Sequence, residues 1–296
     1  MSYFPTRILL ATDGSEEASP ALRAAVVLSM QTGSELHIVH AWQSFPAHSH
    51  PSVALASDSG FYEEEAHRLL FEQLDAVEAM GGATAGAHPK RGRPADTIAA
   101  LSERLEAGLV VVGSRGLGPF RRLVLGSVSE DVVGLAPCPV LVVRGGPEAW
   151  PPSRIVVGDV SSPEARRAGE LAAGIGETFR AQVFLARAHP VIMRVSEAAK
   201  LARTVVTMPY NPLRNHELDL QWRAREMEKE LGRRPRIRVC EGEAASVILA
   251  TAREGGEPAL VAVGRRGLGR VDLLRMGSVS TRVLRAATGP VLVCPS

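Results

Sequence analysis

Cysteine is scarce in this chain of 296 residues, and its three copies are too few and too odd in number for a disulfide framework. Because Cys138, Cys240 and Cys294 lie near apolar runs, we expect three core thiols in a reducing compartment and no metal site. Charge of one sign is also lacking, since the formal net charge is only +2. This small excess argues against nucleic acid or an anionic membrane as the main partner.

Long apolar runs are missing as well. No segment approaches the length of a membrane-spanning helix, and the first residues lack the character of a signal peptide. We therefore expect a cytoplasmic protein with no membrane partner. The Walker phosphate loop, Gly-x4-Gly-Lys-Ser/Thr, does not occur either, which argues against a P-loop enzyme.

What the chain does contain is a long glycine-rich stretch that occurs twice. Residues 113–129 read GSRGLGPFRRLVLGSVS, and residues 264–280 read GRRGLGRVDLLRMGSVS. Each copy follows a short apolar run. A repeat of this length indicates two copies of one domain. We predict domains at 1–146 and 153–296, separated by a linker rich in glycine and proline.

The position of the glycines indicates an anion site. They lie where a strand ends and a helix begins, so backbone amides point outward and the helix dipole favours negative charge. Glycines leave room for phosphate oxygens at the backbone. Ser127 and Ser129 can each cap the helix or donate a hydroxyl to a phosphate. Arg115, Arg121 and Arg122 make the surroundings positive.

Strands and helices alternate along both halves, which predicts an α/β fold with a parallel sheet covered on both faces. The expected strands of the first half lie at 8–11, 36–41, near 83–87, 109–112 and 140–143. Those of the second half lie at 154–157, 183–186, 237–240, 260–263 and 291–294, with a long loop at 187–216. Ligands of such sheets bind at the carboxyl ends of the strands, where Asp13, Ala41 and Gly113 converge.

The pattern Gly-x2-Gly-x9-Gly-Ser, between an apolar strand and a Pro-Val-Leu-Val strand, resembles the universal stress protein family, and Asp13-Gly14-Ser15 fits the same family. The resemblance covers nearly the whole chain. It implies two tandem Rossmann-like (adenine nucleotide alpha hydrolase-like) domains, each a five-stranded parallel sheet with helices on both faces. It also implies that the two fifth strands pair antiparallel.

The resemblance further implies ATP, with or without Mg²⁺, in each half. The glycine stretch would take the phosphates, the turn after the first strand the ribose region, and backbone after the second strand the adenine. The implied residues of the first half are Ala11, Thr12, Asp13, Ala41, Gly113, Ser114, Arg115, Gly116, Gly118, Gly126, Ser127, Val128 and Ser129. Those of the second half are Gly158, Asp159, Ala188, Gly264, Arg265, Arg266, Gly267, Gly269, Gly277, Ser278, Val279 and Ser280.

The second half departs from the family pattern in its first turn. Val160 stands where Asp13 stands in the first half, and Asp159 comes one residue early. Asp272 also replaces Arg121, which lowers the local positive charge. These changes put the nucleoside contacts of the second site in doubt.

Three functions stay open at this point. The first is a nucleotide-binding regulatory protein of the stress response, with adenine nucleotide as its ligand and a homodimer as its assembly. The second is an enzyme, a slow ATPase or phosphotransferase, although no histidine or carboxylate is placed by sequence logic to activate a water. The third is an interaction module with empty clefts. We expect no catalytic residue and no metal, and we interpret His48 and His50 as solvated loop residues.

Overall fold

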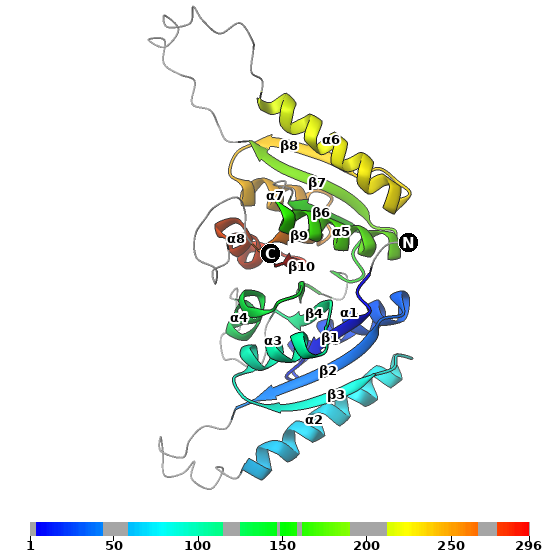
Figure 1. The fold of residues 1–296 in the computed structure, drawn as a ribbon, viewed down its shortest axis with the longest axis vertical. Coiled ribbons are helices and arrows are strands. Elements are labelled where there is room, and N and C mark those ends of the chain that lie inside the picture. The colour runs from blue at the N-terminus through cyan, green and yellow to red at the C-terminus, as the bar shows by residue number, and fades with distance from the viewer. Residues whose placement is uncertain are drawn as a thin grey trace, which may run out of the picture.

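The computed structural model describes residues 4–43, 59–114, 125–146, 149–158, 162–189, 212–265 and 277–295. Within these ranges ten strands form one sheet in the order β3-β2-β1-β4-β5-β10-β9-β6-β7-β8 (Figure 1). Each half contributes five parallel strands, and the halves meet at the antiparallel pair β5 and β10. The predicted fold of the halves and the predicted pairing of their fifth strands are both confirmed.

The elements follow one another in the same order in both halves. In the first half they are β1 (Arg7–Ala11), α1 (Ser19–Thr32), β2 (Glu35–Trp42), α2 (Ser59–Ala79), β3 (Gly86–Arg91), α3 (Pro94–Arg104), β4 (Leu109–Gly113), α4 (Ser127–Leu135) and β5 (Val140–Val143). In the second half they are β6 (Arg154–Gly158), α5 (Pro163–Thr178), β7 (Gln182–His189), α6 (Pro212–Leu231), β8 (Arg236–Glu241), α7 (Ala244–Arg253), β9 (Leu260–Gly264), α8 (Ser278–Ala286) and β10 (Val291–Cys294).

Helices cover both faces of the sheet because the central strands are apolar on both sides. In β1, Ile8 and Leu10 pack in a cluster with α1 and α2, whereas Leu9 and Ala11 pack in a second cluster with α3 and α4. Helices α5 and α6 continue the first cluster across the second half, and α7 and α8 continue the second. Burial of alternate residues on opposite faces is what a doubly covered parallel sheet requires.

The sequence placed two strands imperfectly. β3 begins at Gly86 rather than near residue 83, and it runs on through polar residues. As the outermost strand of its half it does not need an apolar run, so hydrophobicity locates it poorly. β7 continues to His189 and α6 begins at Pro212, so both elements include residues that the sequence assigned to the long loop, and residues 190–211 lie outside the described ranges.

The expectation of three core thiols was wrong for Cys240. All three cysteines are free, but Cys240 is exposed, Cys138 is partly buried and Cys294 is buried. Cys240 lies on the outermost strand β8, where Ile237 and Val239 alternate toward the core and Cys240 does not. Burial raises the pKa of the Cys138 thiol to about 11, which keeps that thiol protonated.

No helix in the described ranges is long and apolar enough to cross a membrane.

Candidate functional site

The carboxyl ends of β1, β2 and β4 meet at one edge of the sheet. Ala11 lies between Val39 and Val112 in the parallel ladders, and the backbone amide of Thr12 donates to the Val39 carbonyl at 3.0 Å. Ala41 follows Val39 on β2, facing the same side. The structure therefore brings together the ends of the three strands that the sequence assigned to the site.

The turn after β1 is held by its own side chains. Asp13 Oδ1 accepts hydrogen bonds from the amide and hydroxyl of Ser15 at 3.1 and 2.7 Å. Thr12 Oγ1 accepts from the Gly14 amide, and Gly14 has a φ of 72°, a conformation that glycine adopts without strain. His40 Nδ1 donates to the Thr12 carbonyl at 2.9 Å. One oxygen of the Asp13 carboxylate thus shapes the turn, in addition to any contact with a ligand.

The base of each glycine stretch is closed by the same pair of backbone hydrogen bonds. The Ser114 amide donates to the Val143 carbonyl, and the Gly126 amide donates to the Ser114 carbonyl, both at 2.9 Å. In the second half the Arg265 amide donates to Cys294, and the Gly277 amide donates to Arg265 at 2.8 Å. Six of the predicted site residues within these stretches lie outside the described residues, and so does a seventh in the turn after β6. They are Arg115, Gly116, Gly118, Arg266, Gly267, Gly269 and Asp159.

A serine in the first turn of the next helix fastens the helix to the strand. The Ser129 hydroxyl donates to the Gly113 carbonyl at 2.7 Å, and the Ser280 hydroxyl donates to the Gly264 carbonyl at 2.6 Å. Both serines are buried. The sequence predicted that Ser129 could cap the helix, but the Ser129 hydroxyl donates its hydrogen bond to the strand carbonyl instead. The N-cap of α4 is Gly126.

Helices α4 and α8 begin without a side-chain cap. Their N-caps, Gly126 and Gly277, carry no side chain, and Ser127 and Ser278 in the first helical position are exposed. Helix α5 is capped by the Ser162 hydroxyl and α7 by the Glu243 carboxylate, whereas α1 and α3 also lack a side-chain cap. The first amides of a helix have no partner within the helix, and they form the positive end of its dipole. Both glycine stretches therefore lead to helix ends that can receive an anion.

Gly264 of the second half is also needed for packing. A Cβ on Gly264 would lie 2.6 Å from Glu164 Cβ and 2.9 Å from the Ala165 amide nitrogen. Gly264 therefore lets the start of α5 approach the end of β9.

Ala188 lies on β7 at the position that Ala41 holds on β2, because Arg154 pairs with Gln182 as Arg7 pairs with Glu35.

The resemblance placed Arg265 among the ATP-binding residues of the second half, and in the structure its guanidinium contacts the first half of the molecule. Its Nη1 donates to the carbonyls of Gly134 and Ala136, both at 3.0 Å, and approaches that of Val133 at 3.5 Å. These carbonyls end α4, where a cation also complements the helix dipole. The repeat pairs Arg265 with Ser114, and this exchange of serine for arginine was the signal that sequence reasoning missed.

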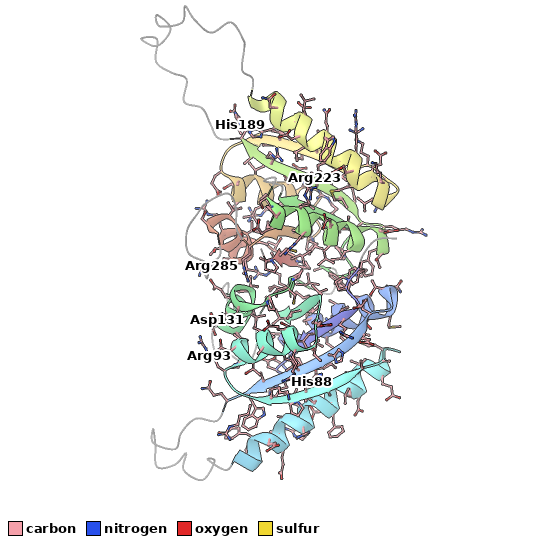
Figure 2. All side chains as sticks on the ribbon, in the orientation of Figure 1. His88, Arg93, Asp131, His189, Arg223 and Arg285 are labelled. Atoms are coloured by element: carbon pink, nitrogen blue, oxygen red, sulfur yellow. The ribbon has the colours of Figure 1, made fainter. Side chains whose placement is uncertain are left out.

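Ion pairs next to the helix starts have exchanged their signs between the halves. In the first half Arg93, the N-cap of α3, pairs with Asp131 of α4 at 3.3 Å. In the second half Glu243, the N-cap of α7, pairs with Arg282 of α8 at 2.8 Å. Arg285 of α8 also reaches across to Glu130 of α4 at 2.6 Å; Figure 2 labels Arg93, Asp131 and Arg285.

The carboxyl of Glu243 has a lowered pKa. Burial opposes its ionisation, but hydrogen bonds from Ser246 and from the amides of Ala245 and Ser246, together with Arg282, hold the pKa of the Glu243 carboxyl at about 2. Glu243 is therefore ionised at neutral pH and caps α7 as a full negative charge.

Known proteins resemble the chain over its whole length. A sequence profile of the universal stress protein family matches residues 5–144 and 152–295. A universal stress protein of Mycolicibacterium smegmatis is 30% identical over 306 residues, covering 97% of this chain and 96% of the relative. A universal stress protein of Thermus aquaticus is 40% identical over 144 residues, which is 46% of this chain and 97% of the relative. The crystal structure of a universal stress protein from Archaeoglobus fulgidus shares the fold, with a TM-score of 0.69, 23% identity and 99% of both chains covered.

Proposed function

Because this chain belongs to the universal stress protein family, we propose that it is a regulatory protein that binds ATP at the carboxyl edge of each half. The observation that carries this proposal is the pair of helix starts at Gly126 and Gly277. Each follows a glycine stretch, neither has a side-chain cap, and each is fixed to its strand by a buried serine. A triphosphate supplies the negative charge that such helix starts favour.

The residues of the first half fit an adenine nucleotide. The amides of Ser127, Val128 and Ser129 would bind the phosphates, the turn at Thr12 and Asp13 would contact the ribose region, and the backbone at Ala41 would contact the adenine. When bound, ATP adds several negative charges and a rigid base to this edge, a change that a partner protein can sense. In the second half the amides of Ser278, Val279 and Ser280, with Ala188, would take the same parts.

The polar side chains of this region make hydrogen bonds and ion pairs with the protein itself, which favours a role in binding over catalysis. Glu130, the carboxylate in the first turn of α4, pairs with Arg285, and the Ser129 hydroxyl donates to a carbonyl. His40 donates through Nδ1 to the backbone of Thr12. Slow hydrolysis remains the second candidate, since amides aimed at a phosphate also stabilise charge that develops on it.

Mass spectrometry of small molecules released from freshly purified protein tests the binding proposal. We expect the released molecule to be an adenine nucleotide. Protein from which the bound nucleotide has been removed (stripped protein) should bind added ATP. A chain that carries no nucleotide and binds none when stripped would support the interaction module with empty clefts. A turnover assay with ATP and Mg²⁺ separates a regulator from a slow ATPase.

The assembly and location of the protein stay predictions. We propose a homodimer in the cytoplasm, with no nucleic acid partner, and light scattering on purified full-length protein would give the oligomeric state. The fifth strands do not offer a free edge for this dimer, because β5 and β10 already pair with each other inside one chain.

A further inference from the structure

The carboxyl end of β7 carries a cluster of buried cationic and imidazole side chains that the proposed nucleotide contacts do not use. Arg187 and His189 alternate with Ala188 and face α6, on the same side of the sheet as the core residues Val183 and Leu185. Arg187 is only 6% exposed and His189 only 4%. Figure 2 labels His189 at the end of β7, beside the start of α6.

Two residues of α6 complete the cluster. Arg187 Nη1 lies 3.3 Å from Asp219 Oδ2 and donates to His216 Nδ1 at 3.5 Å. Since His216 Nδ1 accepts this hydrogen bond, the proton of a neutral His216 ring lies on Nε2. The rings of His189 and His216 have their centres 5.5 Å apart at an angle of 55°.

His189 is the residue that points to a ligand. Its Nδ1 is buried and has no hydrogen-bond partner among the described residues, which is costly for a polar atom out of water. Asp219, the carboxylate next to Arg187, is largely exposed, and so is Glu241, which pairs with His189 in the ladder. The buried part of the cluster therefore holds donors and positive charge, while its carboxylates face water.

The first half shows that the fold does not require this cluster. The strand register places His40 at the position of Arg187 and Trp42 at that of His189. Trp42 stacks on Tyr62, with ring centres 6.1 Å apart at an angle of 18°. An aromatic pair thus occupies in one half the place that a histidine pair with a buried arginine occupies in the other.

The helices correspond in the same way. The buried residues Leu70 and Val77 of α2 match Leu220 and Met227 of α6, because both pairs are seven residues apart. His216 then stands where the first half has a residue with no polar side chain, Ala66. The histidine is therefore specific to the second half, like the arginine that it contacts.

We propose that Arg187, His189 and His216 form a binding site for a small phosphate-bearing ligand at the carboxyl end of β7, separate from the glycine stretch of the same half. The planar guanidinium offers paired donors to phosphate oxygens, and an imidazole N–H can bind a third oxygen. Burial strengthens each of these hydrogen bonds, because little water competes with them. The ligand would supply the hydrogen-bond partner that His189 Nδ1 lacks.

Histidine NMR on the full-length protein tests this site with inorganic phosphate as the probe. The ring resonances of His189 and His216 are assigned with His189→Gln and His216→Gln, and phosphate is titrated against sodium chloride at equal ionic strength. We expect both rings to shift with a saturating response to phosphate, and His37 in the first half to stay unchanged. Gly277→Val should leave the response intact, which separates this site from the glycine stretch.

Three variants sharpen the test. Arg187→Gln should weaken phosphate binding on the order of tenfold to a hundredfold, since a charged hydrogen-bond donor is lost. Asp219→Asn should strengthen it severalfold, because a competing carboxylate is removed from an exposed position. Arg238→Gln is the matched control, since Arg238 on β8 pairs with Glu254 away from the cluster, and it should bind phosphate like the wild type.

Rings that do not respond to phosphate would overturn the proposal, and so would an unchanged response in folded Arg187→Gln. If Arg187→Gln fails to fold, Asp219→Asn decides, because a purely structural ion pair predicts no gain in phosphate binding. A response to succinate with none to phosphate would indicate a carboxylate site and contradict the proposed phosphate site.

Discussion

The two halves share their backbone machinery and differ in their charges. Both close the glycine stretch with the same hydrogen bonds, and both fasten the next helix by a serine to a strand carbonyl. Yet the ion pair of Arg93 with Asp131 in the first half corresponds to the ion pair of Glu243 with Arg282 in the second half. The positive and negative residues have exchanged positions between the two pairs. The two halves therefore share their backbone hydrogen bonds. Their side-chain charges differ, although each ion pair still joins one positive and one negative residue.

The largest effect should come from filling the space at the helix starts. We expect Gly126→Val to weaken nucleotide binding in the first half on the order of a hundredfold, because several charged hydrogen bonds to phosphate are lost together. Gly277→Val should do the same in the second half. Their φ angles are −64° and −63°, so valine meets no left-handed strain and the fold should survive. Calorimetric titration with ATP on each single variant measures the effect.

Gly134→Ala is the control for these variants. It lies in the same helix, and a Cβ there meets nothing within 4 Å. Its nucleotide affinity should equal that of the wild type. If folded Gly126→Val lost no more affinity than Gly134→Ala, the phosphates would not lie at the start of α4.

The contact between the halves gives the next largest effect. Arg265→Ala removes the guanidinium that binds the last carbonyls of α4, and we expect it to lower the free energy of unfolding by about 1–3 kcal/mol. Ser114→Ala changes the equivalent residue of the first half and should cost less than about 0.5 kcal/mol. Urea unfolding compares the two, and equal losses would show that the arginine adds nothing to the contact.

The lowered pKa of Glu243 predicts that the stability of the protein depends on pH in the acid range. Its pKa is lowered in the folded protein from the usual 4.5 to about 2, so its stabilising effect is complete above pH 4.5 and is lost as the pH falls toward 2. Glu243→Gln should therefore cost about 0.5–1 kcal/mol at pH 7 and much less near pH 2. Unfolding measured across this range checks the sign, and a difference that grew at low pH would contradict it.

The exchanged ion pair should give the smallest effect. Arg93→Glu alone places a glutamate near Asp131 and should cost about 0.5 kcal/mol, and adding Asp131→Arg should restore most of that loss. The double variant would give the first half the charge order that the second half already has. A double variant less stable than Arg93→Glu would show that the surroundings fix the signs.

The sequence predicted the architecture well because the repeat and the apolar strands are strong local signals. The central strands, such as Ile8 to Ala11 and Leu109 to Val112, are buried on both faces and read as continuous apolar runs. β3 was placed too early and Cys240 was taken for a core residue, because outermost strands are covered on fewer sides. A run of hydrophobic residues indicates a buried strand. Strands at the edge of a sheet are only partly buried, so hydrophobicity predicts them poorly.

The sequence could not predict contacts between distant side chains. The resemblance placed Arg265 among the ATP-binding residues, but its spacing could not show that its guanidinium binds a carbonyl about 130 residues earlier, on α4. Arg187 was taken as the start of a loop, although it is a buried strand residue that meets His216 and Asp219 of the next helix. Spacing along the chain gives the position of the backbone, whereas the direction of a long side chain depends on the packed fold.

Nucleotide binding at both helix starts is tested by calorimetric titration of ATP into full-length protein freed of bound nucleotide, beside the double variant Gly126→Val/Gly277→Val. We expect the wild type to bind nucleotide in both halves and the folded double variant to bind none at the same concentrations. Binding to the double variant with unchanged affinity, or no binding to the wild type, would contradict it.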